Sequence, residues 1–166
     1  MVRYRVGTSL YASVLFTILG GIAVVTGQPF IFPSLGPTAF ILAFDRRGAR
    51  TNSYRIVGSH IIGVTAGLIA YGLIANGVSL TAAPLAYSPE SVRLAFSGVV
   101  SIALTSWGVI AVDANHPPAC ATTLIVSLGL LSTPLAAATI VGAVIILVES
   151  HQLFILGWES LVDYLE

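Results

Sequence analysis

The stretch DANHPPACATT, from Asp113 to Thr123, places an acid, an amide, an imidazole, two prolines and a thiol in an apolar part of the chain. A residue that precedes proline is driven out of the α region, so His116 and Pro117 are expected to be extended. A helix can then begin only at about Pro118. The segment 114–131 is therefore predicted to be an extended strip followed by a half-helix, because the prolines interrupt it near its start.

The composition indicates a membrane protein. Hydrophobic residues make up 56% of the 166 residues and charged residues only 8%, with a mean hydropathy of +0.95. Such a chain is not a soluble globule, and it holds about four to six crossings within one domain, 1–166. Seven arginines are balanced by seven acids, without a basic run of the kind that binds nucleic acid. The single cysteine excludes an intrachain disulfide.

Four segments are apolar and long enough to cross a bilayer as helices. They are Val6–Thr26, Arg55–Ala75, Ser91–Val112 and Pro134–His151. Arg3 and Arg5 precede the first segment as in a signal peptide, but this segment lacks a clear cleavage site and is expected to be retained. Residues 152–166 mix apolar and acidic side chains with Trp158 and Tyr164, which predicts an interfacial helix. The predicted fold is an all-α, polytopic transmembrane helix bundle in the cell membrane.

A second broken segment, 28–44, lies between the first two predicted helices. Pro33 and Pro37 interrupt it near its beginning, and Ser34 is available as an N-cap. A shift of the chain by 84 positions lays Pro33 on Pro117 and Thr38 on Thr122, with twelve identities in the compared window against roughly five expected. Unless the match is coincidence among Ile, Val and Gly, the chain is two copies, 6–76 and 90–151, of helix, broken segment and helix.

Charge predicts how these copies cross the membrane. Arg3 and Arg5 precede the first helix, and the larger arginine cluster follows the first broken segment, in DRRGARTNSYR, residues 45–55. Placing both clusters in the cytoplasm requires the broken segment to cross, which gives three crossings per copy and an inverted 3+3 repeat. The alternative is four full crossings with two re-entrant segments, a parallel repeat, and the larger cluster facing outward.

The starts of the two half-helices predict a binding site. Free amides and a positive dipole end inside the membrane suit an anion or a polar solute, and matched broken helices mark the binding sites of transporters. The candidate substrate-binding residues are Asn115, His116, Ser34, Thr38, Thr122 and Thr123, and the helix-breaking residues are Pro33, Pro37, Pro117 and Pro118. No Lys or Arg lies at the centre of a predicted crossing, so an anion is expected to be held weakly.

Several of these residues allow two interpretations. His116 binds substrate or carries a proton, or it caps the half-helix. Asp113 couples transport to protons with His116, or it anchors a helix end at the headgroups. Thr38 and Thr122 line the cavity, or their hydroxyls bond back to the preceding turn. Cys120 is expected to be a packing residue, since no partner stands at metal-ligand spacing.

The second predicted helix carries two further signals. His60 is expected to form interhelical hydrogen bonds rather than to bind a ligand. Gly63 and Gly67 form a GxxxG pattern, which predicts a helix-packing face that can also serve as a subunit contact.

The sequence NHPPACATT, paired with the upstream FPSLGPTAFILAFDRRGARTNSYRIVGSHIIG, resembles the HPP family of small integral membrane proteins. The likeness covers roughly residues 10–149, nearly the whole chain. The family is described as having four membrane helices, and some cyanobacterial and chloroplast members are linked to nitrite transport. The resemblance therefore implies a transporter for nitrite or a similar small anion.

The leading hypothesis is a membrane transporter or channel that passes a small inorganic anion, nitrite foremost, and is not an enzyme. Its expected partners are that anion, the lipid bilayer and further copies of the chain, and neither a cofactor nor a metal is expected. One alternative is a membrane-embedded enzyme that uses Asp113, His116 and Cys120. Another is a non-transporting structural subunit of a membrane complex, favoured by the small size and the GxxxG pattern.

Overall fold

The helices of the chain follow the hydropathy pattern closely. The computed structural model describes residues 2–48 and 51–165, and within them the chain is helical, without strands. The helices are α1 (Val2–Thr26), α2 (Leu35–Phe44), α3 (Ser53–Ala70), α4 (Pro89–Ala111), α5 (Ala119–Ser127) and α6 (Pro134–Leu165). A π-helical turn, η2 (Tyr71–Ala75), extends α3, and a 3-10 turn, η3 (Leu80–Ala82), precedes α4. The prediction of an all-α fold is confirmed.

Four helices in the described part of the chain are long and apolar enough to cross a membrane. Their apolar spans are Tyr4–Thr26, Ser53–Ala75, Pro89–Ala111 and Pro134–Gly157, which confirms the four predicted helices. Local chemistry sets their ends. Asn52 caps α3 by accepting a hydrogen bond from the amide of Arg55, and Ser88 caps α4 in the same way from Ser91. Gly27 ends α1 with a φ of +65°, a conformation that glycine adopts without strain.

The last segment differs from its prediction as a separate helix. Residues 152–165 continue α6 without a break, so that α6 runs for 32 residues. No proline occurs in α6 after its first residue, and a single glycine in a helix interior costs only about 1 kcal/mol, so nothing ends the helix at residue 152. Trp158 and Tyr164 lie among side chains outside those that the structure describes, and the interfacial position of this segment stays a prediction.

The first short helix runs back along α1. The hydroxyl of Tyr4 donates to the carbonyl of Phe44 at 3.2 Å, and Arg46 Nη2 donates to the carbonyl of Gly7 at 3.4 Å. At the other end, a Cβ added at Gly20 would lie 3.8 Å from Ile31. The segment from Ile31 to Phe44 therefore follows α1 from Gly20 back to Tyr4, a stretch of α1 that spans about 24 Å. It does not turn back on itself.

The second short helix runs along α3, in the same direction as α3. A Cβ added at Gly58 would lie 3.5 Å from Ala114, and one at Gly129 would lie 2.9 Å from the ring of Tyr71. Between these points Gly63 faces Ala119, with 2.8 Å from an added Cβ to the carbonyl oxygen. Residues 114–118 and α5 therefore lie along α3 from near its start to its end, and this segment does not reverse direction.

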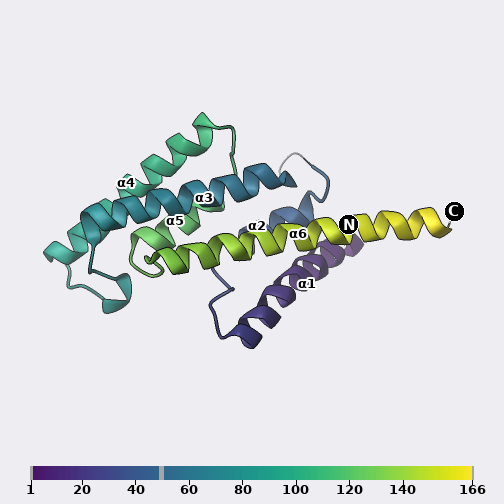
Figure 1. Cartoon of the computed structure of the whole chain (residues 1–166), viewed down its shortest axis with the longest axis horizontal. Helices are drawn as coiled ribbons and strands as arrows, with labels where there is room; N and C mark the ends of the chain where they lie inside the picture. The colour runs from purple at the N-terminus through teal and green to yellow at the C-terminus, as the bar shows by residue number, and fades with distance from the viewer. Residues whose placement is uncertain (1, 49–50, 166) are drawn as a thin grey trace.

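The six segments alternate in direction along the described chain (Figure 1). The start of α3 lies beside the end of α4, because Tyr54 donates to the carbonyl of Val112 at 2.9 Å. Gln152 of α6 also lies at this place, where it contacts Ser53. Since α2 runs antiparallel to α1 and α5 runs parallel to α3, the two short helices point in opposite directions. Both termini lie toward the same end of the molecule (Figure 1).

The main hydrophobic core lies where α1, α2, α3 and α6 meet. Its fully buried side chains come from all four helices and include Leu15, Leu19, Leu35, Leu42, Ile56, Ile140, Val144 and Leu147. Burial of a leucine or isoleucine side chain contributes roughly 1.5–3 kcal/mol in water, and here it also fixes which face of each helix turns inward. The polar residues on the remaining inward faces are thereby brought together beside this core.

Candidate functional site

A buried polar cluster lies where the first turns of both short helices meet α3. Thr38 comes from α2, His60 from α3, Thr122 from α5, and His116 from the strip just before α5. His116 is 3% exposed and the other three side chains are fully buried. Polar groups at this depth are costly unless they are hydrogen-bonded, so their gathering at one place is a specific feature of this fold.

Thr38 joins the two imidazoles. Its Oγ1 lies 3.3 Å from Nε2 of His60 and 3.1 Å from Nε2 of His116, and it also donates to the carbonyl of Ser34 at 3.1 Å. On the other side of His60, Nδ1 lies 2.7 Å from Oγ1 of Thr122. The two imidazole rings are 5.5 Å apart, centre to centre. The hydroxyls and imidazoles therefore form one network that spans three helical elements.

The direction of the bonds in this network depends on the tautomer of each imidazole, because a neutral ring presents one donor and one acceptor nitrogen. The oxygen of Thr38 lies within hydrogen-bonding distance of Nε2 of both histidines and of the carbonyl of Ser34. Among the described residues Nδ1 of His116 has no polar partner, which leaves it open to a proton or a ligand.

The first amides of α5 correct one expectation. Pro117 and Pro118 form a turn, and the helix begins at Ala119. The amides of Ala119, Cys120 and Ala121 donate to the carbonyls of residues 116–118 at 3.0–3.1 Å. These tight bonds to the third residue back satisfy donors that the sequence predicted to be free for an anion. Side chains, rather than these amides, are thus the groups that the second half-helix offers.

Ser34 occupies the N-cap position of α2 without acting as a cap. Its backbone is already helical, with φ −71° and ψ −23°, and its side chain makes no capping hydrogen bond. Its Oγ is fully buried and has no hydrogen-bond partner. A buried hydroxyl without a partner is unusual and lies here one helical turn before Thr38, so it is available to a small polar ligand.

The remaining predicted residues lie toward α4. Thr123 contacts Thr105 at 2.8 Å, and its hydroxyl also donates to the carbonyl of Ala119 at 3.1 Å. Asn115 is exposed and lines a pocket of about 200 Å³ together with His116, Cys120 and Thr105. His116 therefore lies in the lining of a pocket beside α4.

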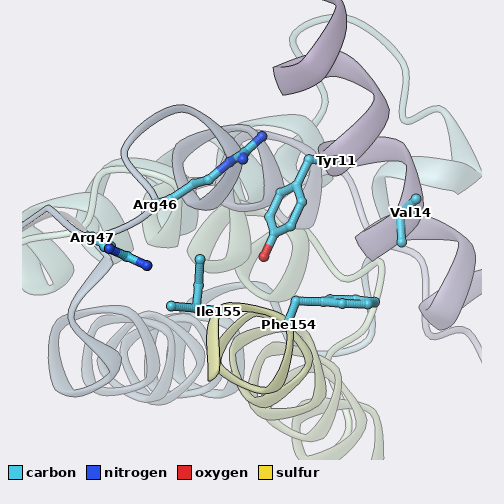
Figure 2. Close-up of a pocket in the computed structure, with 6 residues that line it drawn as sticks. All are labelled: Tyr11, Val14, Arg46, Arg47, Phe154 and Ile155. Atoms are coloured by element: carbon cyan, nitrogen blue, oxygen red, sulfur yellow. The ribbon is translucent and has the colours of Figure 1, made fainter. Parts of the chain in front are cut away.

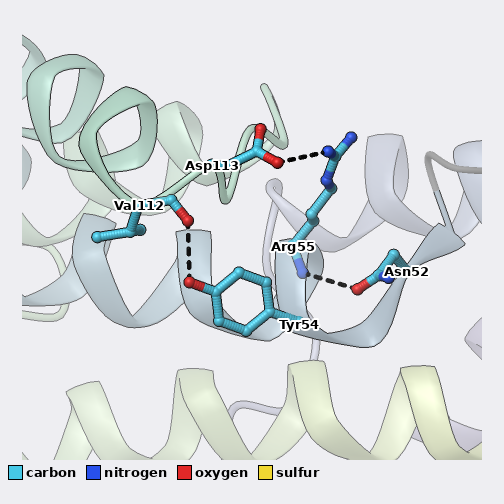
Figure 3. A network of polar contacts seen from close by, with 5 residues as sticks. All are labelled: Asn52, Tyr54, Arg55, Val112 and Asp113. Carbon is cyan, nitrogen blue, oxygen red and sulfur yellow. Dashed lines mark hydrogen bonds and ion pairs between the residues drawn. The ribbon is translucent and has the colours of Figure 1, made fainter.

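Asp113 belongs to a different contact from the one with His116 that the sequence suggested. Its carboxylate pairs with Arg55 at 2.8 Å and its side chain is 82% exposed (Figure 3). It lies at the end of α4 with a φ of +52°, next to the bond between Tyr54 and Val112 (Figure 3). Of the two roles left open for Asp113, this geometry favours the helix-end anchor.

Two features of the site differ from what the sequence indicates. The prediction that His60 forms interhelical hydrogen bonds is confirmed, but these bonds go to Thr38 and Thr122, so His60 is part of the cluster although it is not among the predicted site residues. Its position as a titratable residue in the middle of an apolar span was the available signal. On α4 the side chains of Ser97, Ser101 and Thr105 are fully buried and recur every four residues. Ser97 donates to the backbone carbonyl of Ser127 at 2.8 Å, and Thr105 contacts Thr123 of α5. This stripe was not predicted.

The long apolar helices and the polar residues buried between them define a polytopic helical membrane protein. Residues 2–159 match the family described as HPP, transmembrane region, and the chain belongs to this family. No curated protein and no solved structure matches the chain. The resemblance drawn from NHPPACATT is therefore confirmed.

Proposed function

We propose that this protein is a transporter or channel of the cell membrane for a small anion, nitrite foremost, and that the anion binds at the cluster of Thr38, His60, His116 and Thr122. The observation that carries the proposal is the meeting of two short, oppositely directed helices with α3 at buried imidazoles and hydroxyls. Binding sites of secondary transporters lie at such places, where interrupted helices of two repeats meet near the membrane centre.

An inverted 3+3 repeat is the proposed architecture. The shift of 84 positions carries Leu35, the first residue of α2, onto Ala119, the first residue of α5. Each short helix and its strip advance along a neighbouring helix over about 20–24 Å, against a hydrocarbon core of about 30 Å. The contact of Arg46 with Gly7 brings the arginine-rich loop to the same end as Arg5, as the positive-inside rule requires for a crossing segment.

Binding is proposed to depend on hydrogen-bond donors and one ionisable nitrogen. The groups that can donate are the imidazoles of His60 and His116 and the hydroxyls of Ser34 and Thr122, and neither Lys nor Arg contributes to the described cluster. Uptake of a proton at Nδ1 of His116 makes the imidazole a cation beside the anion. Loss of this proton then releases the anion. Weak, reversible binding of this kind suits a fast carrier or channel.

Transport also requires the cluster to open. Thr38 binds His60 and His116 at once, so it holds α2 against α3 and the strip before α5. The small pocket lined by Asn115 and Cys120 gives access from one side while this network closes the other. In the proposed step, His60 and His116 give up their bonds to Thr38 and bind the anion instead. This lets α2 separate from α3 and from the segment before α5.

The test is nitrite uptake into liposomes that contain only the purified protein, with and without a pH gradient, and with formate, nitrate and chloride as competitors. We expect uptake to fall at least tenfold in His116→Gln, since a lost charged hydrogen bond contributes roughly 1.5–3 kcal/mol. Asp113→Asn is the matched control and should keep both the uptake and its response to the gradient. Equal uptake by wild type and His116→Gln would remove His116 from the pathway.

The same measurement separates the other functions considered. Absence of flux for every anion would favour a structural subunit, although the GxxxG face that suggested one is filled by α5 of the same chain. Anion that enters the liposomes unchanged would support transport over catalysis. Flux that follows the pH gradient would indicate a coupled carrier, and flux indifferent to it a channel.

A further inference from the structure

A row of buried hydroxyls lies between α4 and α5, beyond the histidine cluster. It consists of Ser97, Ser101 and Thr105 on α4 and of Thr123 and Ser127 on α5, and all five side chains are fully buried. Thr105 contacts Thr123 at 2.8 Å, and Ser97 donates to the backbone carbonyl of Ser127 at 2.8 Å. Because these two contacts join the helices at both ends of the set, the five side chains form one polar strip, the hydroxyl row.

The hydroxyl row begins at the pocket of His116. Thr105 lines this pocket of about 200 Å³ together with His116 and Asn115. Ser97 lies eight residues before Thr105 on α4, a distance of about 12 Å along the helix. The end of α4 lies beside the start of α3, near the arginine-rich loop. The row therefore runs away from that loop, from the pocket into the opposite half of the bundle.

Ser127 is the member of the row that points to a ligand. Its Oγ is fully buried and has no hydrogen-bond partner among the described residues. Ser127 lies one helical turn after Thr123, on the face of α5 that Thr123 turns toward Thr105, so its hydroxyl faces the row. A serine that only packs two helices together donates to a nearby carbonyl, as Ser97 and Ser101 do. The donor of Ser127 is left for a group from outside the chain.

An apolar group closes the far end of the row. Leu94, three residues before Ser97 on α4, packs with Ala75 and Val78, and these three side chains are 0–8% exposed. Apolar constrictions of this kind stop ions by excluding water. The hydroxyl row thus lies between the pocket of His116 on one side and a closed apolar constriction on the other.

We propose that the hydroxyl row is the outer half of the anion pathway, and that Ser127 donates to the anion after it leaves His116. This inference rests on the proposed function and adds the route by which the anion leaves the histidine cluster. Hydroxyls suit this step because they donate hydrogen bonds without a fixed charge, so the anion is held weakly and moves on. Leu94 is the outer gate, which separates from Ala75 and Val78 as the anion passes.

The first experiment measures nitrite uptake into liposomes and the melting temperature of Ser127→Ala. Its hydroxyl makes no bond within the described chain, so its removal should not lower the melting temperature. We expect uptake to fall about fivefold, the effect of one lost hydrogen bond to the anion. Ser59→Ala is the matched control, because Ser59 is equally buried on α3 and donates to the carbonyl of Ile56, outside the row. It should keep the uptake of wild type.

The second experiment examines the row without transport. With Cys120 replaced by serine, Ser127→Cys and Ser97→Cys are treated with 2-sulfonatoethyl methanethiosulfonate from the outer side of right-side-out vesicles. Ser59→Cys is again the control. We expect both row cysteines to react roughly tenfold faster than the control, because the reaction requires a thiolate that water and the anionic reagent reach. Nitrite should slow the reaction at both positions.

Two outcomes would overturn the inference. Unchanged uptake by Ser127→Ala, with a wild type that transports nitrite, would do so and leave the proposed function standing. Row cysteines no more reactive than Ser59→Cys would do so whether or not wild type transports nitrite. Row cysteines that react and are protected by nitrite, in a protein without flux, would contradict the transport function alone and support anion binding in the row.

Discussion

At the scale of single residues, the site depends on Thr38. Its hydroxyl contacts two imidazoles and the carbonyl of Ser34 in the preceding turn. Thr38→Val keeps the shape and removes these contacts, leaving Nε2 of both buried imidazoles without this hydrogen-bond partner. We expect a loss of about 1–3 kcal/mol in the free energy of unfolding, and a loss of anion uptake at least as large as in His116→Gln.

Thr65→Val supplies the control for this prediction. The hydroxyl of Thr65 also bonds back to the carbonyl four residues earlier, at 2.8 Å, but the side chain is exposed on α3. We expect this variant to stay within about 0.5 kcal/mol of wild type and to transport normally. Thermal unfolding in detergent and liposome uptake measure both variants, and equal behaviour of the two would contradict a shared role for Thr38.

At the scale of helices, the contact between α3 and α5 rests on the two glycines of the GxxxG pattern. The predicted packing face is confirmed, and it is used within the chain. A Cβ at Gly63 would lie 2.8 Å from both the carbonyl of Ala119 and the hydroxyl of Thr123, and one at Gly67 would lie 2.8 Å from Val126. A backbone carbonyl cannot rotate away, so the close approach of α5 requires glycine here.

Gly63→Ala is therefore expected to push α5 away from α3 and to displace Thr122 from His60. The expected cost is about 1–3 kcal/mol of stability, together with reduced uptake. Gly142→Ala on α6 is the matched control, because an added Cβ there meets nothing within 4 Å and alanine favours the helix. A Gly63→Ala protein as stable as Gly142→Ala in thermal unfolding would show that the contact tolerates separation.

At the scale of the whole molecule, six alternating segments place the chain termini and the arginine-rich loop at one end. Thr51 lies in that loop, and Tyr87, 98% exposed, lies in the loop before α4 at the other end. With Cys120 replaced by serine, we expect Thr51→Cys to react with an impermeant maleimide only from the cytoplasmic side. Tyr87→Cys should react only from the outer side.

A cysteine at Tyr4 provides the reference for this topology. Tyr4 contacts Phe44 at the end of α2, so cysteines at Tyr4 and Thr51 should label from the same side. Labelling of these two positions from opposite sides would mean that the first short helix re-enters rather than crosses. It would also remove the inverted repeat, since four crossings give two copies of the same orientation.

The sequence by itself determined the class of protein, the four long helices and the two short ones. Hydropathy acts residue by residue, and a proline restricts its own neighbours whatever lies around them, so these features need no knowledge of the fold. The same local reasoning selected His116, Thr38 and Thr122, because the start of a helix after a proline can be read from the chain, and the fold brings these residues into one cluster. It did not place the end of α6, where no local signal marks a boundary, and it left the first amides of α5 free although they are bonded within the chain.

The tertiary structure alone decided how the polar groups are paired. Asp113 binds Arg55, His60 joins the site, and Ser34 is left without a cap or a partner. The pocket that Tyr11, Arg46 and Phe154 line likewise requires α1, the loop after α2 and α6 to meet (Figure 2). Each of these contacts links residues far apart in sequence, and each depends on the rotation and close approach of packed helices. Helix rotation is set by the whole core at once, so no single stretch of the chain encodes it.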